Sequence, residues 1–421
     1  MTSTVQRLPS KLSFSWQLPV LLFLPSLLQY FGLASSLTLG ASVAALVVLA
    51  KQATQHLQQP VNRQVTQLSI GTLILLLCAA ILLHLLLAAA VRPVDLTRSG
   101  LSFIPLTLIL VAGYRLAQLM LSARDQAVER AVYASFWLLC AVGLAAIGGL
   151  VPPISGTYFK PVFPYTEPSH FALAFLPLLM FGSVSSRGVA RLVMLAIGLA
   201  MGWALESLTL MAGWLLVALV CLRKTTAFTL LGLVALGAAQ LDISYFLTRL
   251  DFGSDDPNLS TLVYVQGWQL MAESLRLSSG WGLGFQQLGV HGSSVDASDL
   301  IFAVLGENLN LLDGGFTMSK IVSEFGIFGI LLLLVYLQFA WRAARGLRHA
   351  SRTTQPHRPA VLLAHCAVLS FGVELLVRGA GYFSGTTLLL VAGLTVLATR
   401  KHAVRFTGTQ GAGAPAASAH R

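Results

Sequence analysis

Charged residues are scarce in this sequence. Asp, Glu, Lys and Arg make up 10% of its 421 residues, whereas a soluble domain carries about 25%. Hydrophobic residues make up 56%, and apolar runs recur that approach the roughly 20 residues of a transmembrane helix. This composition excludes a soluble globular domain and predicts an all-α polytopic integral membrane protein.

Cysteine is scarce as well. The four cysteines lie in apolar runs without CxxC spacing, which excludes a disulfide framework and a zinc site and indicates small buried hydrophobic residues. They are Cys78, Cys140, Cys221 and Cys366. A nucleotide-binding loop is also missing, because GWGLGF (280–285) follows no predicted strand and lacks a GK[ST] ending. No metal ion and no cofactor is expected.

Acidic residues are outnumbered, with 16 against 27 Lys and Arg, and the formal net charge is +11. Such a balance can indicate nucleic-acid binding, but most of the basic residues lie in every second connection between apolar runs. By the positive-inside rule these connections and both termini are cytoplasmic. They contain only two acids, Asp125 and Glu129. Membrane lipids, and no nucleic acid, are therefore the expected surroundings.

The apolar runs predict about twelve transmembrane helices. The expected spans are 17–34, 36–50, 68–91, 101–121, 131–151, 169–184, 189–205, 207–222, 226–241, 318–341, 359–377 and 385–399. Helices one to nine thus occupy 1–241, and helices ten to twelve occupy 318–399. Residues 400–421 form a cytoplasmic tail whose Gly/Ala-rich composition predicts disorder.

One large external loop, 242–317, separates the ninth and tenth spans. Long loops of this kind are usually functional or disordered, and this one is not of low complexity. Asn258 can cap a helix whose apolar spacing over 259–277 is amphipathic. A glycine-punctuated turn at 280–289 and a second apolar segment at 299–312 follow. The loop falls late in the chain, unlike the central cytoplasmic loop of a transporter with two similar halves.

The stretch TEPSHFALAF (166–175) places two polar side chains at the outer mouth of the sixth span. Glu167 and His170 are three residues apart, so both can face one cavity if the helix begins near Pro168. An ionised Glu167 beside a neutral His170 forms a competent proton acceptor. Alternatively, Glu167 only complements the helix dipole and His170 is an interfacial residue.

Cations lie near the outer ends of several spans, where charges are candidate functional groups. Arg378, in VRGAGYFSG with Tyr382, suits a pyrophosphate because its guanidinium is forked and permanently charged; alternatively it pairs with Glu374 one turn earlier. Arg249 can bind substrate or pair with nearby Asp residues. Lys160, among aromatics, can hold a phosphate or belong to an anchoring belt.

Weaker candidates are more readily explained by local pairing. Arg276 can pair with Glu273, and Lys320 with Glu324, each on one helix face. The remaining candidates are His291, which is the only His of the large loop, Arg92 and Arg98 between the third and fourth spans, and the pair Asp255 and Asp256, which more often caps a turn than holds a metal. His84, deep in the third span, is expected to pack or to bond a backbone carbonyl.

Four stretches together resemble the O-antigen polymerase and ligase superfamily, the Wzy/WaaL type of bacterial envelope glycosyltransferase. They are YTEPSHFAL, NLSTLVYVQGWQLMAESLRLSSGWGLGFQQLG, SKIVSEFGIFGILLLL and VRGAGYFSG. The order of these stretches and the one large, late loop are features of that group, and the chain resembles the polymerase branch more closely than the ligase branch. The resemblance implies a multi-pass, GT-C-like enzyme of the bacterial inner membrane whose active site faces the periplasm.

The resemblance also implies a reaction and its participants. An oligosaccharide would move from undecaprenyl pyrophosphate to the non-reducing end of another lipid-linked repeat unit, with a chain-length regulator protein as an optional further partner. Pyrophosphate leaves, so Arg378 and Arg249, with Lys160 in reserve, are the expected clamps. Glu167 is the expected base, with His170 or His291 as alternatives. Three aromatic residues of the large loop are expected to stack on sugars, namely Trp268, Trp281 and Phe285.

Two other classes of function remain open. One is an O-antigen ligase, which would transfer the glycan to a lipid A core. The other is a transporter or flippase for lipid-linked sugars, which would need charges spread along a path through the bundle. The predicted charges cluster on the outer side instead, and this favours a one-sided catalytic site.

Overall fold

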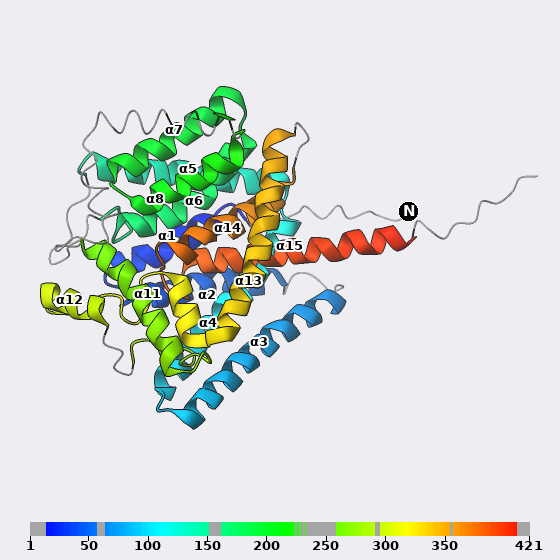
Figure 1. The fold of residues 1–421 in the computed structure, drawn as a ribbon. Helices are drawn as coiled ribbons and strands as arrows, with labels where there is room; N and C mark the ends of the chain where they lie inside the picture. The colour runs from blue at the N-terminus through cyan, green and yellow to red at the C-terminus, as the bar shows by residue number, and fades with distance from the viewer. Residues whose placement is uncertain are drawn as a thin grey trace, which may run out of the picture.

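The computed structural model describes residues 14–56, 64–150, 161–223, 258–290, 295–353 and 357–410, together with 225, 226, 229 and 232. Within these residues the protein is all-helical and contains no strand beyond one isolated bridge, Val162 to Tyr165. The helices lie in a bundle in which several run roughly side by side and others cross them (Figure 1). The predicted all-α fold is confirmed.

The bundle is made of helices that match the predicted apolar runs. They are α1 (Gln17–Tyr30), α2 (Leu37–His56), α3 (Gln64–Val91), α4 (Leu96–Ser122), α5 (Asp125–Ile147), α6 (Pro168–Ser185), α7 (Gly188–Ala204), α8 (Leu208–Cys221), α13 (Thr317–Arg352), α14 (Pro359–Leu376) and α15 (Gly385–Gln410). Six are long and apolar enough to cross a membrane, namely α3 from Gly71 onward, α4, α5, α6, α13 and α14. The apolar parts of the others are shorter, and in α2 and α15 they cover only Leu37–Ala50 and Gly385–Thr399. The predicted span 226–241 lies mostly outside the described residues.

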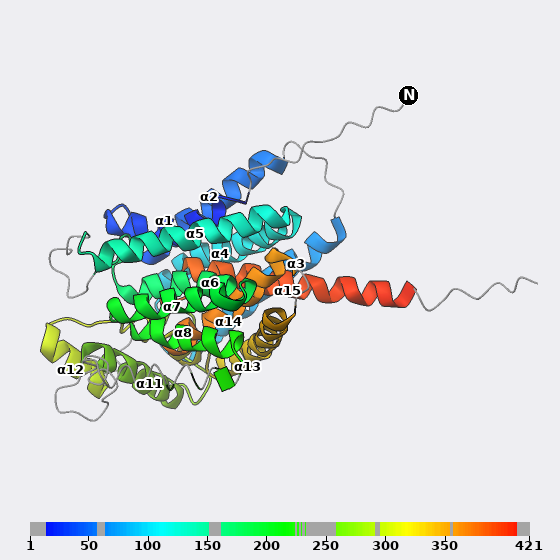
Figure 2. The same cartoon turned by 90° about the horizontal axis from the view of Figure 1, so that it is seen from above.

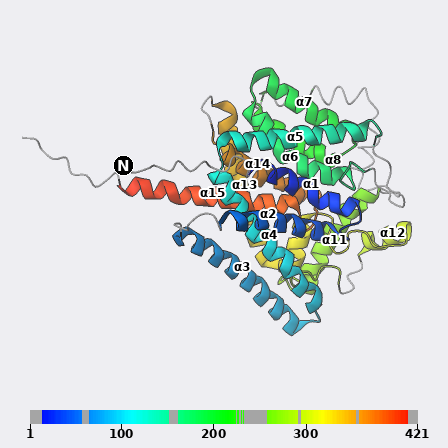
Figure 3. The same cartoon turned by 180° about the vertical axis from the view of Figure 1, so that it is seen from behind.

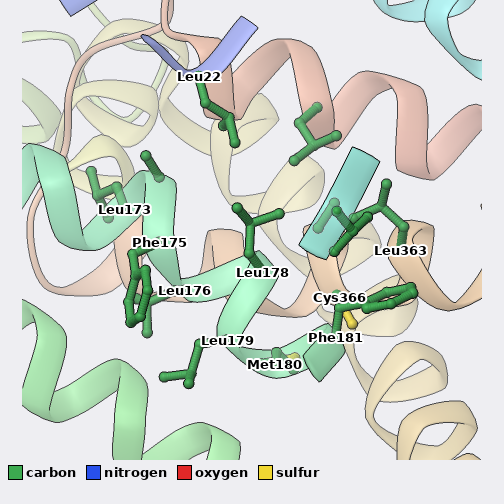
Figure 4. Packing of buried hydrophobic residues seen from close by; sticks show 14 of the residues in the cluster. Leu22, Leu173, Phe175, Leu176, Leu178, Leu179, Met180, Phe181, Leu363 and Cys366 are labelled. Carbon is green, nitrogen blue, oxygen red and sulfur yellow. The ribbon is translucent and has the colours of Figure 1, made fainter. Parts of the chain in front are cut away.

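Helices α6 and α14 form the centre of the bundle and α3 its edge (Figures 1 and 2). Nearly every side chain of α6 is buried, and Figure 4 shows its Leu and Phe side chains packed against those of neighbouring helices. Phe171 and Phe175 stack with ring centroids 5.4 Å apart. In a membrane such packing depends on close contact between helices, because the hydrophobic effect does not drive helices together there. Gly213 of α8 allows a close contact with α6, because a Cβ at this position would lie 2.2 Å from Leu176.

Arginines join the helix ends on the side that the charge pattern assigns to the cytoplasm. Arg191, at the start of α7, donates to the carbonyls of Ser183, Ser186, Cys221 and Ser351 at 2.8–3.1 Å. These carbonyls end α6, α8 and α13, where the last helical C=O groups have no partner within the helix. The basic residues of this side therefore also satisfy helix C-termini.

Two helices precede α13 and lie at the opposite end of the bundle, as Figure 3 shows from behind. They are α11 (Leu259–Leu277) and α12 (Asp296–Leu305). The predicted helix over 259–277 is confirmed, and Asn258 caps it by accepting from the Ser260 N–H at 3.0 Å. The predicted apolar segment 299–312 is only partly helical. Helix α12 ends at Leu305, and its C-cap residue Gly306 has a left-handed backbone conformation.

Helix α13 is not continuous, although 318–341 was predicted as one span. Gly326 has φ 56° and ψ −129°, so the chain leaves helical geometry there. The glycine-rich turn at 280–284 fits into the break and replaces the lost hydrogen bonds: Leu283 N–H donates to Ser323 O and Gly284 N–H to Glu324 O, both at 2.9 Å. Irregular backbone at membrane depth is tolerated when protein groups satisfy it in this way.

Candidate functional site

The candidate site lies where α6 begins and α14 ends. Pro168 starts α6, Glu167 is its N-cap, and His170 stands in its first turn. The Nε2 of His170 lies 3.1 Å from Oε1 of Glu167. Arg378, two residues beyond the end of α14, places Nη2 at 3.1 and 3.2 Å from the two carboxylate oxygens of Glu167. The structure thus brings three of the predicted site residues together.

Glu167 is ionised in this arrangement. Burial acts to raise the pKa of its carboxyl, but the Arg378 guanidinium, His170 and the Ser169 hydroxyl oppose it, and the pKa falls to about 2. Because a carboxylate only accepts hydrogen bonds, this contact favours the tautomer of neutral His170 that carries its proton on Nε2. The neutral His170 ring then has its lone pair on Nδ1. A carboxyl with so low a pKa is a weak base near neutral pH.

A second ion pair, between Lys320 and Asp313, lies near the first. Lys320 belongs to the first turn of α13, and its side chain is 3% exposed. Its ammonium donates to Asp313 Oδ1 at 2.7 Å and to the Leu312 carbonyl at 2.9 Å, and lies 5.1 Å from the centre of the Tyr382 ring. Lys320 therefore bonds Asp313 and not Glu324, the partner that its helical spacing predicted.

Asp313 connects the two pairs electrostatically. Its partial burial acts to raise its pKa, while Lys320 and, from further away, Arg98 and His170 lower it, and the net shift is downward. Sequence reasoning did not single out Asp313. The signal available was its position directly before Gly314 and Gly315, which both have positive φ and turn the chain into α13.

Glu324 and Arg98 tie the glycine-rich turn to the site. Glu324 is fully buried, and its Oε2 accepts from the Gln286 N–H at 2.9 Å. Arg98, near the start of α4, places Nη2 3.5 Å from the Gln286 side-chain oxygen. Gln287 donates to the Ser99 hydroxyl at 2.7 Å. Arg98 is thus a third cation close to Lys320 and Asp313.

Arg378 does not pair with Glu374, although their one-turn spacing in the sequence allowed such a pair. The chain leaves helical geometry after Leu376, so Arg378 turns toward α6. Glu374 is 1% exposed and accepts hydrogen bonds from two hydroxyls that precede or begin α15, those of Ser384 and Thr386. Although Glu374 and Arg378 are close in the sequence, they therefore belong to two different polar clusters.

The glycines around Arg378 let backbone approach backbone closely: a Cβ on Gly379 would lie 2.6 Å from the Thr317 nitrogen, and one on Gly385 would lie 2.4 Å from the Leu21 carbonyl oxygen. Gly379 N–H also donates to Gly315 O at 3.0 Å. The Gly379 contacts hold the segment that follows α14 against the start of α13, and the Gly385 contact holds it against α1.

The remaining predicted residues lie apart from this cluster or outside the described residues. Arg276 is 71% exposed and pairs with Glu273 at 2.6 Å on its own helix, as the alternative interpretation predicted. Trp268 packs on Phe316 and is partly exposed, whereas Phe285 is buried and cannot stack on a sugar in this conformation. Those outside the described residues are Lys160, Arg249 and His291, with Asp255 and Asp256.

His84 is a structural histidine, as predicted. Its Nε2 lies 2.9 Å from the Trp281 carbonyl oxygen, and its ring packs against those of Phe325 and Phe328. Trp281 itself is largely exposed at the glycine-rich turn. His84 therefore fixes this turn against α3 and takes no part in the charged cluster.

Neither a protein-family model nor a curated protein matches the chain.

Proposed function

We propose that the protein is a bacterial polysaccharide polymerase, a membrane glycosyltransferase that uses an undecaprenyl-pyrophosphate-linked donor. The observation that carries the proposal is the meeting of Arg378, Glu167 and His170 at one end of the bundle. A general base and a fixed cation there stand side by side, with Lys320 and Arg98 nearby. The local resemblance to O-antigen polymerases supports the same function.

The cations account for the leaving group. Pyrophosphate departs with additional negative charge, which fixed donors at a partly dry site stabilise strongly. Arg378 contacts Glu167 through Nη2, so the rest of its forked guanidinium can meet phosphate oxygens. Lys320 and Arg98 supply further positive charge. Glu167 and Asp313 neutralise part of this positive charge, so the cations can stay close together before an anionic substrate binds.

His170 is the better candidate for the base. Glu167, predicted for this role, has too low a pKa and already holds two partners. In the proposed step, Nδ1 of His170 takes the proton of an acceptor sugar hydroxyl, and that oxygen attacks the anomeric carbon of the donor. The bond from this carbon to the pyrophosphate oxygen breaks, and undecaprenyl pyrophosphate leaves with the electron pair. Glu167 positions His170 and stabilises the imidazolium that forms.

The proposal includes a membrane topology. Twelve spans with both termini in the cytoplasm would put the Glu167–Arg378 end, with α11 and α12, on the periplasmic side of the inner membrane. The sorting of arginines to the other end of the bundle supports this orientation. A lipid-linked donor would then reach the site from the outer leaflet.

The break in α13 favours one alternative, a transporter of lipid-linked sugars. Discontinuous helices with charged residues near the break form substrate sites in many transporters, and Glu324 and Lys320 lie in the part of α13 that precedes Gly326. In this protein, however, the glycine-rich turn fills the break and satisfies its backbone groups. We therefore favour the catalytic interpretation.

One reconstitution separates these functions. Purified protein in lipid nanodiscs is given an undecaprenyl-pyrophosphate-linked oligosaccharide, with a lipid A core acceptor in a second arm. A ladder of lengthened glycans in the first arm supports the polymerase, and transfer only in the second identifies a ligase. In sealed vesicles, movement of the lipid-linked sugar across the bilayer without new glycosidic bonds would contradict both and favour the transporter.

A further inference from the structure

Glu374 is a buried carboxyl that the proposed mechanism does not use. It is 1% exposed, near the end of α14 in the centre of the bundle. Arg378, its nearest cation along the chain, is bonded to Glu167 instead. A carboxylate buried without a cation is unfavourable unless hydrogen bonds compensate for its lost hydration. Such a group is suited to binding a proton.

A chain of hydroxyls surrounds this carboxyl. Ser384 Oγ lies 3.2 Å from Oε1 of Glu374, and the Thr386 hydroxyl donates to Oε2. Ser384 Oγ in turn lies 2.8 Å from the Thr386 hydroxyl and 2.9 Å from that of Thr387. Hydroxyls both donate and accept, so a connected set of them can pass a proton along.

A cavity links these hydroxyls to His170. It has a volume of about 30 Å³, and its lining includes His170, Tyr165, Ser384 and Thr386. This is enough space for a water molecule, and the imidazole and the two hydroxyls offer it the polar partners that a buried water needs. Thr386 also lines a smaller cavity, together with Ser370 and Glu374. Thr386 therefore stands between His170 and Glu374.

Few other ionisable groups face Glu374. Helix α13 presents Tyr336, which lies within electrostatic range of the carboxylate. The Tyr336 hydroxyl donates a hydrogen bond to the Val368 carbonyl. Helix α6 presents His170 to the larger cavity, which Ser384 and Thr386 line as well, and α15 presents only hydroxyls here. Among the described residues, His170 is thus the group placed to exchange a proton with Glu374 through the cavity.

We propose that Glu374 is a proton-binding site that receives, through the cavity water and the hydroxyls of Thr386 and Ser384, the proton that His170 takes from the acceptor. The proton leaves the imidazolium, which returns to neutral imidazole, and converts the Glu374 carboxylate to the acid. Its release to bulk water resets the site. The role as a relay rests on the proposed function, whereas the proton-binding site itself does not.

Infrared spectroscopy tests the site without substrate. Difference spectra of the protein in bilayers, recorded across a pH titration, should contain a carboxylic acid C=O band that disappears in Glu374→Gln. The band should shift in Thr386→Val, which removes one donated hydrogen bond at almost constant volume. It should stay in place in Ser370→Ala, because Ser370 lines the smaller cavity but bonds only within its own helix. If Glu374→Gln shows the same pH-dependent C=O bands as the wild type, the proposal is overturned.

Turnover tests the relay. Glu374→Gln and Thr386→Val should each slow chain extension about tenfold or more, and azide, a small proton carrier, should restore part of the rate. A merely structural defect would not respond to azide. If the wild type extends chains and Glu374→Gln does so at the same rate and with the same pH profile, the relay is wrong and the polymerase stands. If the wild type makes no polymer, the polymerase fails while the infrared result is unaffected.

Discussion

Arg378 Nη2 lies 3.1 and 3.2 Å from the two carboxylate oxygens of Glu167, across 211 positions of the sequence. The contact joins the end of α14 to the start of α6, the two helices at the centre of the bundle. His170 contacts the same carboxylate through Nε2. The pair is therefore both a structural connection and the core of the proposed site.

Breaking this pair from one side should destabilise the protein. Arg378→Met leaves the Glu167 carboxylate buried without its cation, and we expect a loss of about 3–5 kcal/mol in the free energy of unfolding. Glu167→Gln combined with Arg378→Met should recover part of the loss, because no buried charge remains. Thermal unfolding in detergent measures both. Equal melting temperatures for the wild type and Arg378→Met would contradict this assignment.

The contribution of Glu167 should depend on pH. Its pKa is about 2 in the folded protein against an ordinary value of 4.5, so its stabilisation is complete above pH 4.5 and is lost as the pH falls toward 2. The difference in stability between wild type and Glu167→Gln, on the order of 3 kcal/mol, should narrow over that window. Glu273→Gln, in an exposed pair, is the matched control. A difference that stays constant down to pH 2 would show that Glu167 does not carry the effect.

His170 should matter for the rate and little for the fold. His170→Gln keeps a donor for Glu167 but removes the basic nitrogen, so chain extension should fall about 100-fold or more at a nearly unchanged melting temperature. His84→Gln is the control, because its ring bonds only a backbone carbonyl and packs on aromatics. Full polymer synthesis by His170→Gln would place the base elsewhere.

Gly326 should be irreplaceable. Its φ of 56° is strained for other residues, and a Cβ there would lie 2.1 Å from the Gly280 carbonyl oxygen. Gly326→Ala should displace the glycine-rich turn and cost about 3 kcal/mol or more of stability, measured by thermal unfolding. Gly100→Ala, helical and with open space around it, should leave stability unchanged or slightly higher. Equal stability of the two variants would mean that the break in α13 tolerates a side chain.

Local pattern predicted the helices and the part of the site that is close in sequence. Apolar runs located the helices of the bundle, Asn258 indicated the start of α11, and the three-residue spacing of Glu167 and His170 predicted that they meet. Each of these depends on neighbours within one or two turns. Helical periodicity contains this information.

The long-range partners could not be predicted in this way. The spacing rules paired Arg378 with Glu374 and Lys320 with Glu324, because they assume that the helix continues through both residues. The chain leaves α14 before Arg378, and a loop residue, Asp313, is closer to Lys320. The break at Gly326 likewise depends on a turn about forty residues earlier that supplies its hydrogen bonds.

Arg378→Lys tests the central claim most directly, since it keeps the charge but removes the forked guanidinium. With the nanodisc-reconstituted protein and a lipid-linked repeat unit, we expect release of undecaprenyl pyrophosphate and growth of the glycan to fall together, about 100-fold or more. Arg276→Lys, in an exposed pair on α11, should match the wild type. Wild-type release and chain growth by Arg378→Lys would contradict the account.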